Sequence, residues 1–144
     1  MNGQRQAPDF QTFTKNSAPQ APHVLLVDKD ASSAETGRKL LEELGYRVTA
    51  CATSAEALSM LHAPSEKFNC VISDLSMPGI SGLELANTSR LCRPNTPFVL
   101  ACGDHSSLPP DYLQTLGISG FVLKPFSIDR LSQTLHRALA KRRH

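Results

Sequence analysis

The chain has 144 residues, of which 40% are hydrophobic and 19% are charged, and its formal net charge is +2. This length suits a single domain with one layered core, and the composition is that of an ordinary globular protein. The small net charge gives no reason to expect a nucleic-acid partner, and no apolar stretch is long enough to place the chain in a membrane.

The four cysteines, at positions 51, 70, 92 and 102, are spread along the chain without a close pair. This spacing contains no metal-binding motif and no disulfide framework, so we expect reduced thiols. The N-terminus lacks the apolar region of a signal peptide. Together these features predict a cytoplasmic protein.

Residues 1–22 are rich in Gln, Pro, Asn and Ser and show no periodicity, which predicts a flexible N-terminal leader. From residue 23 to 140, short apolar runs alternate with amphipathic segments, so we expect one structured domain there. Residues 141–144 form a basic C-terminal end, interpreted as a solvated helix end. The apolar runs predict five strands, at 24–27, 47–50, 70–73, 98–101 and 120–123.

Helices are expected between the strands. The first should span about 32–44 and end before Gly45, a common residue just after a helix. Thr53 and Ser81 each precede a glutamate by three residues, the spacing of a capping box, so a helix should begin after each. The last helix should begin at Ser127 and carry an apolar stripe along one face.

The connection between the fourth and fifth strands is less regular because it contains Pro109 and Pro110. A proline is tolerated in the first turn of a helix and disrupts its interior. Any helix in this connection should therefore begin near Pro110 and end before Gly117, after about two turns.

Strands that alternate with helices imply parallel pairing through right-handed crossovers. We therefore predict an α/β fold, a doubly wound five-stranded parallel sheet of order 2-1-3-4-5 with helices on both faces. Ligands of such sheets bind beyond the carboxyl ends of the strands, near the switch between strands one and three. Asp28 follows the first strand, Asp74 the third and Lys124 the fifth. The sequence thus predicts a charged site at this edge of the sheet.

The stretches VLLVDKD, VISDLSMPGISGLEL and LGISGFVLKPF resemble, in order and spacing, the receiver domains of two-component response regulators. The resemblance covers residues 23 to about 140 and implies the flavodoxin-like receiver fold. It also implies a His–Asp phosphorelay function, in which a histidine kinase or a histidine phosphotransfer protein donates a phosphoryl group. A receiver signals through protein–protein contacts and is not an enzyme beyond its own phosphorylation and dephosphorylation. The downstream target stays unknown.

The resemblance assigns roles residue by residue. Asp74 matches the phosphoacceptor aspartate, Asp28 matches an acidic residue that helps to hold Mg²⁺, and Ser76 matches the residue whose backbone carbonyl binds the metal. Lys124 matches the lysine that pairs with the phosphoryl group. Phe121 matches the switch aromatic, whose rotation reports phosphorylation.

Two positions depart from the family pattern. Lys29 stands where the family has a second metal-ligating acid, and Cys102, a weak hydrogen-bond donor, stands where it has Thr or Ser. Two lysines, Lys29 and Lys124, then balance the two carboxylates without any metal. An ammonium in the metal position would also repel a divalent cation. We therefore expect Mg²⁺ binding to be possible but weak, with Lys29 close to Asp74.

Other interpretations remain open. A degenerate receiver would keep the fold and bind protein partners without being phosphorylated, as Lys29 and Cys102 indicate. The D-x-D spacing of Asp28 and Asp30 is similar to the nucleophile motif of haloacid-dehalogenase-like phosphatases, although the chain has no room for their cap domain. An FMN-binding flavodoxin is disfavoured because the loop after the first strand is acidic. Asp30 itself offers either a substitute metal ligand or a negative charge in the first turn of a helix.

Overall fold

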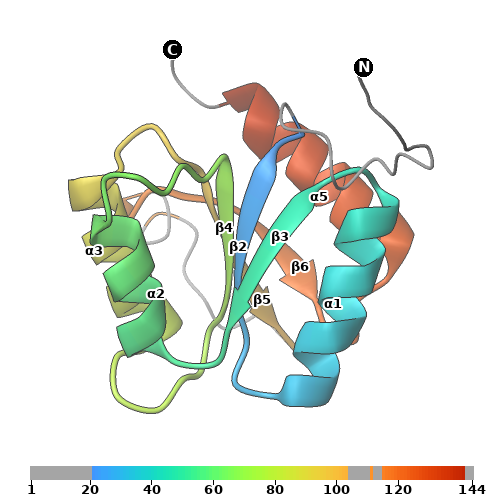
Figure 1. Cartoon of the computed structure of the whole chain (residues 1–144), viewed down its shortest axis with the longest axis horizontal. Helices are drawn as coiled ribbons and strands as arrows, with labels where there is room; N and C mark the ends of the chain where they lie inside the picture. Colours follow the sequence, from blue (N-terminus) through green and yellow to red (C-terminus); the bar gives the residue numbers. More distant parts are fainter. Residues whose placement is uncertain (1–20, 104–110, 112–114, 142–144) are drawn as a thin grey trace, which may run out of the picture.

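The computed structural model describes residues 21–103, 111 and 115–141. Its five strands pair in parallel in the order β3-β2-β4-β5-β6, which is second, first, third, fourth and fifth along the chain (Figure 1). The predicted sheet order is therefore confirmed. The strands are β2 (His23–Val27), β3 (Arg47–Cys51), β4 (Cys70–Asp74), β5 (Phe98–Cys102) and β6 (Ile118–Leu123).

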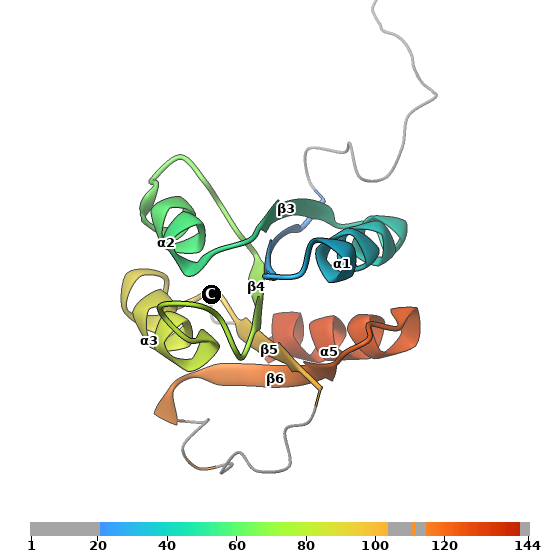
Figure 2. The same ribbon diagram turned by 90° about the horizontal axis from the view of Figure 1, so that it is seen from below.

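The described helices cover both faces of the sheet. Helices α1 (Ala31–Glu43) and α5 (Ile128–Lys141) lie on one face, and α2 (Ser54–His62) and α3 (Gly82–Cys92) lie on the other. Figure 2 shows the two layers of helices with β3 and β6 at the opposite edges of the sheet. Within the part of the chain that the structure describes, no helix is long and apolar enough to cross a membrane.

Three predictions concern segments outside the described residues. They are the leader up to residue 20, the short helix at Pro109 and Pro110, and the basic end after Lys141.

The predicted helix starts are confirmed by their caps. The Thr53 hydroxyl accepts a hydrogen bond from the Glu56 amide at 3.1 Å, and α2 begins at the next residue. Ser81 and Glu84 form the complete capping box at the start of α3. At α2 the box is shifted, because the Glu56 carboxylate accepts from the amide that precedes Thr53. The Ser127 hydroxyl accepts from the amide three residues later and begins α5.

Successive residues of the strands are buried on opposite faces of the sheet. Leu25 and Val27 of β2 pack beneath α2 and α3, whereas Val24 and Leu26 pack beneath α1 and α5. All four are at most 1% exposed, so β2 has no polar face. A parallel sheet covered on both sides requires such continuous apolar runs, and this is why the polar residues directly after the strands stand out in the sequence.

The carboxyl ends of the parallel strands meet at one edge. Asp28 follows β2, Asp74 is the last residue of β4, and Lys124 follows β6. The Asp28 amide donates to the Cys51 carbonyl and the Lys124 amide donates to the Cys102 carbonyl, each at 3.0 Å. These bonds continue the sheet by one residue, so the backbones of Asp28 and Lys124 are held in place like those of strand residues.

Candidate functional site

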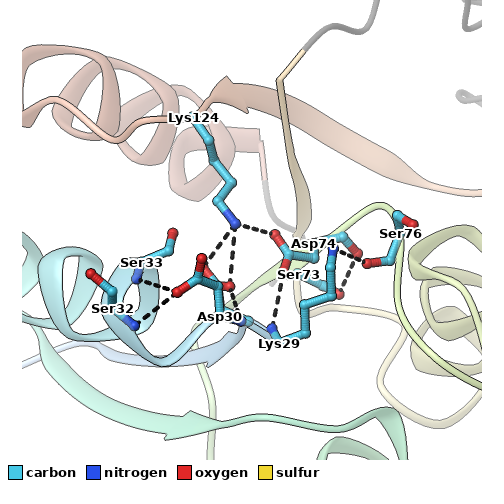
Figure 3. Close-up of polar contacts among 9 residues, drawn as sticks. Lys29, Asp30, Ser32, Ser33, Ser73, Asp74, Ser76 and Lys124 are labelled. Atoms are coloured by element: carbon cyan, nitrogen blue, oxygen red, sulfur yellow. Dashed lines mark hydrogen bonds and ion pairs between the residues drawn. The ribbon is translucent and has the colours of Figure 1, made fainter.

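Two buried carboxylates share one lysine at the carboxyl edge of the sheet. Figure 3 shows this lysine, Lys124, pointing toward Asp74. The Lys124 ammonium donates to Asp74 Oδ1 at 2.8 Å and to Asp28 Oδ1 at 3.2 Å. The side chains of Asp28 and Asp74 are only 1% and 4% exposed, and that of Lys124 is 21% exposed. Burial of this kind is tolerated when the charges are paired, and here one ammonium serves both acids.

Backbone amides of the loop after β2 hold the same carboxylates. The Lys29 amide donates to Asp74 Oδ2 at 3.1 Å, and the Asp30 amide donates to Asp28 Oδ1 at 2.9 Å. Both oxygens of Asp74 therefore have a donor. Asp28 Oδ2 lies 3.1 Å from the Lys124 nitrogen in an ion pair, and this buried oxygen accepts no hydrogen bond from the residues that the structure describes.

The fold shifts the pKa values of Asp28 and Asp74 in opposite directions. Burial disfavours the ionised form of Asp28, but the hydrogen bonds from the Asp30 amide and the Lys124 ammonium outweigh burial and hold its pKa below the ordinary value. Burial raises the pKa of Asp74 in spite of its bond to Lys124, and the charge of Asp28 adds to the rise. Burial also opposes the charge of Lys124, yet the two carboxylates raise its pKa. Asp74 is thus the more basic carboxylate.

Lys29 contacts both sides of the site. Its backbone amide holds Asp74, as described above, and its ammonium donates to the backbone carbonyl of Ser76 at 2.7 Å. Lys29 therefore lies close to Asp74, as expected, but through its backbone. Among the described residues, no ion pair joins the Lys29 ammonium to the Asp74 carboxylate. The Lys29 ammonium instead donates to the Ser76 carbonyl, which the resemblance assigns as a metal ligand.

Asp30 has a structural role in this arrangement. Its carboxylate caps α1 by accepting from the amides of Ser32 at 2.9 Å and Ser33 at 3.2 Å. The sequence offered two roles for Asp30, a substitute metal ligand or a negative charge at the start of a helix. The structure shows the second of these.

Cys102 ends β5 and lines an open cavity of about 370 Å³. Asp74 lies at this cavity, which has room for a group attached to its carboxylate. Lys29, Ser76 and Lys124 line the same space. The structure therefore brings five of the predicted site residues to one cavity. Asp28 does not line the cavity but accepts a hydrogen bond from Lys124, which does.

Phe121 is placed differently. It lies within β6, opposite Leu100 of β5, and packs against the apolar cluster beneath α2 and α3. It is not among the described residues that line the cavity. Its role as a switch aromatic stays a prediction.

Gly82 also determines the shape of the site, although the sequence did not lead us to predict this role. Its amide donates to the Leu75 carbonyl at 2.8 Å, and a Cβ at this position would lie 2.2 Å from the carbonyl oxygen of Asp74. Any larger residue would push the start of α3 away from the end of β4. The glycine directly after the helix cap Ser81 was the available signal, because that position does not otherwise favour glycine.

The residues do not fit a divalent cation as they are arranged. Of the predicted donors, Asp28 and Asp74 are bonded to the Lys124 ammonium, and the Ser76 carbonyl is bonded to that of Lys29. The part of the chain that the structure describes contains no group of three or more His, Cys, Asp or Glu side chains that could hold a metal. Mg²⁺ prefers about six oxygen ligands, and here two positive charges would join a pocket whose charges already cancel.

Comparisons with known proteins agree on one family. The model of the response regulator receiver domain matches residues 24–136. The C4-dicarboxylate transport transcriptional regulatory protein DctD of Rhizobium meliloti is 38% identical over 125 residues, which are 85% of this chain and 26% of DctD. The transcriptional regulatory protein FixJ of Bradyrhizobium diazoefficiens is 31% identical over 118 residues, which are 81% of this chain and 56% of FixJ. The chain thus spans only part of the length of these curated relatives.

Solved structures show the same fold. The chemotaxis protein CheY4 of Vibrio cholerae superposes with a TM-score of 0.74 at 29% identity, covering 82% of this chain and 98% of CheY4. The receiver domain of the sensor histidine kinase PA1611 of Pseudomonas aeruginosa has a TM-score of 0.73 at 20% identity, covering 84% of this chain and 99% of that domain. That structure holds a magnesium ion in its active site cleft, but at this identity the likeness supports the fold alone.

Proposed function

This chain belongs to the response regulator receiver domain family, and from that membership we propose that Asp74 accepts a phosphoryl group in a His–Asp phosphorelay. Receiver domains interact with histidine kinases and phosphotransfer proteins, and one of these is the proposed donor. The output is proposed to be a protein–protein contact made by the phosphorylated domain, in the cytoplasm. The observation that carries the proposal is the buried Asp74 carboxylate, 2.8 Å from Lys124 and open to a cavity of about 370 Å³.

The proposed reaction needs a nucleophile and nearby positive charge. An Asp74 oxygen forms a bond to phosphorus as the P–N bond of the donor phosphohistidine breaks, and the electron pair leaves with the donor's imidazole nitrogen. The Lys124 ammonium neutralises charge on the phosphoryl oxygens, which is the main assistance that such a transfer requires. The new phosphoryl group carries nearly two negative charges, enough to reorganise the loops around it.

Asp74 suits this role better than Asp28 does. The raised pKa of Asp74 marks the more basic carboxylate, and Asp74 lines the cavity. The lowered pKa of Asp28 marks a carboxylate whose charge is held by hydrogen bonds, and Asp28 is not among the described residues around that cavity. The buried Asp28 instead contacts the Lys124 ammonium, at 3.2 Å from Oδ1.

Receiver domains bind Mg²⁺ in their active sites. For this chain we propose that Mg²⁺ binds only weakly, because ammonium groups contact all three predicted donors.

A second candidate function is a phosphorylation-independent interaction module. It is favoured by the Lys29 ammonium on the Ser76 carbonyl and by Cys102 in place of a hydroxyl residue. The retained pairing of Asp74 with Lys124 favours the phosphoacceptor instead.

Mass spectrometry after incubation with phosphoramidate, a small donor with a P–N bond, tests the proposal. One added phosphate is expected on the wild-type chain and on Asp28→Asn, and none on Asp74→Asn. A phosphate that survives Asp74→Asn and is lost in Asp28→Asn would support the phosphatase-like alternative. A wild-type chain that takes no phosphate would support the interaction module.

A further inference from the structure

The Lys29 ammonium, we infer, replaces the divalent cation in phosphoryl transfer, so that Asp74 is phosphorylated without Mg²⁺. The inference rests on the proposed function of Asp74 as the acceptor. It concerns the same site. Besides Lys124, phosphoryl transfer would use a second positive charge, and this charge would come from a side chain of the protein and not from a bound metal ion.

Lys29 is tied to the acceptor by its backbone. Its amide donates to Asp74 Oδ2 at 3.1 Å, so its position relative to the nucleophile does not depend on the side chain. The ammonium then reaches the Ser76 carbonyl at 2.7 Å, two residues beyond the acceptor (Figure 3). The Lys29 side chain thus bridges the loop after β2 and the loop after β4, at the cavity that Asp74 lines.

The charges of the site suit this role. Two carboxylates and two ammonium groups cancel before the reaction. After transfer, the Asp74 carboxyl group is part of an acyl phosphate and has lost its own charge, and the phosphoryl group and Asp28 together exceed the two lysines by about one negative charge. An acid at position 29 would leave an excess of about three charges, which would then require a divalent cation.

The contact of the Lys29 ammonium is exposed to solvent. Lys29 is exposed, so its contact with the Ser76 carbonyl competes with water and costs little to break. A lysine has a flexible stem and three donors, and it can exchange a carbonyl for a phosphoryl oxygen within the same cavity. Lys124 is held by two carboxylates and lacks this freedom.

Apart from Lys29, no described residue at the cavity supplies a second positive charge for the phosphoryl oxygens. The residues around the cavity include two cations, Lys29 and Lys124, and no third one among those that the structure describes. Asp30, which the sequence offered as a substitute metal ligand, caps α1 with its carboxylate.

Phosphorylation rates with phosphoramidate, in excess EDTA and in Mg²⁺, test the inference. In this reaction an Asp74 oxygen bonds to phosphorus, the P–N bond breaks, and the protonated nitrogen leaves as ammonia with the electron pair. The wild-type rate in EDTA should lie within about twofold of the rate in Mg²⁺, since no charge-assisted contact is lost. Lys29→Met should be slower than wild type by at least about tenfold in EDTA. Lys29→Asp should be equally slow in EDTA and recover in Mg²⁺.

Lys39→Met is the matched control, because Lys39 is an exposed lysine on α1 that pairs with Glu35 at 3.9 Å and with no other acid among the residues that the structure describes. Its rates should equal those of the wild type. Far-ultraviolet circular dichroism of each variant confirms that it is folded.

Calorimetric titration supplies a readout besides phosphorylation. Lys29→Asp should bind Mg²⁺ at least about tenfold more tightly than wild type, or about 1.4 kcal/mol. Equal affinities would overturn the inference, as would a wild-type rate that falls tenfold in EDTA or a Lys29→Met rate that equals wild type. These results leave Asp74 as the acceptor. If Mg²⁺-loaded Lys29→Asp takes phosphate and the wild-type chain takes none, the inference and the proposed function both fail.

Discussion

The two ends of the sheet satisfy their polar groups in different ways. At the amino ends of the strands, the His23 ring contacts the Lys67 carbonyl at 3.1 Å and the Thr49 hydroxyl at 2.7 Å, and the His23 amide donates to Asn69 at 2.8 Å. These bonds join neutral groups, and each nitrogen of His23 has a hydrogen-bond partner. At the carboxyl ends, two buried carboxylates share one lysine, and within the described part of the chain Asp28 Oδ2 accepts no hydrogen bond.

Arg93 shows the same contrast for a charged group. Near the amino ends of the strands its guanidinium donates to the carbonyls of Leu61 at 2.8 Å and Ala63 at 2.9 Å, at the end of α2, and lies 5.7 Å from the ring centre of Phe68. This cation has backbone partners and faces no carboxylate in these contacts. Lys124 faces two carboxylates. We propose that the polar contacts at the amino end serve stability and that those at the carboxyl end serve the phosphoryl transfer.

The largest effect is expected from Lys124→Met. The change removes the fixed cation beside Asp74, so phosphorylation by phosphoramidate should slow by at least about 100-fold. The time course of phosphate addition, followed by mass spectrometry, measures the rate. A rate within tenfold of wild type would show that the carboxyl end does not depend on this lysine.

Arg93→Met should affect stability and leave the reaction unchanged. The variant loses hydrogen bonds to carbonyls at the C-terminus of α2 and the contact with Phe68, so the free energy of unfolding should fall by about 2 kcal/mol. Urea denaturation followed by circular dichroism measures this loss. A change in the phosphorylation rate without a loss of stability would contradict the division between the two ends.

The same isosteric change at the two aspartates should have opposite effects. The lowered pKa of Asp28 means that its ionised form stabilises the fold above its unfolded value of 3.8, and this stability is lost as the pH falls through the folded value. Asp28→Asn should therefore cost about 1–2 kcal/mol at pH 7. The raised pKa of Asp74 means that its ionised form opposes folding as the pH rises through the folded value, so Asp74→Asn should be neutral or stabilising, by less than about 1 kcal/mol.

Thermal unfolding of both asparagine variants at pH 7 checks this prediction. Two losses of equal size would mean that the fold does not distinguish the charges of the two carboxylates.

The smallest effect is expected at His23. Burial, and then the charge of Arg47, lower the pKa of His23 from its ordinary value of 6.5. The ring nitrogen that contacts the Lys67 carbonyl already carries one proton, so a second proton would reverse the bond with the Thr49 hydroxyl and place a positive charge on a ring where burial and Arg47 oppose it. The unfolded chain therefore binds this proton more readily, and stability should fall as the pH drops below about 6.5.

The loss at His23 should stay under about 1 kcal/mol, because the ring is partly exposed and lies near the opposing charge of Glu66. Melting temperatures of wild type and His23→Gln, compared between pH 7.5 and pH 5.5, measure it. A His23→Gln variant with the same pH dependence as wild type would exclude this residue as the cause.

Much of the fold was predictable because its signals are local. Apolar runs without a polar face require a sheet covered on both sides, and the residues directly after those runs must then lie at one edge. The caps at Thr53, Ser81 and Ser127 are also local, since each hydroxyl bonds an amide three residues away. From these signals the sequence determined the strand order and which charged residues would meet.

The tertiary structure alone decided what those residues do to one another. The sequence did not reveal that the Lys29 ammonium would choose the Ser76 carbonyl while its amide held Asp74, because those partners lie more than forty positions away. Nor did it show that two aspartates at equivalent strand ends would have pKa values moved in opposite directions. Such outcomes depend on the distances between loops of different strands and on the water that packing removes from each carboxylate, and both are set only when the sheet and its helices have assembled.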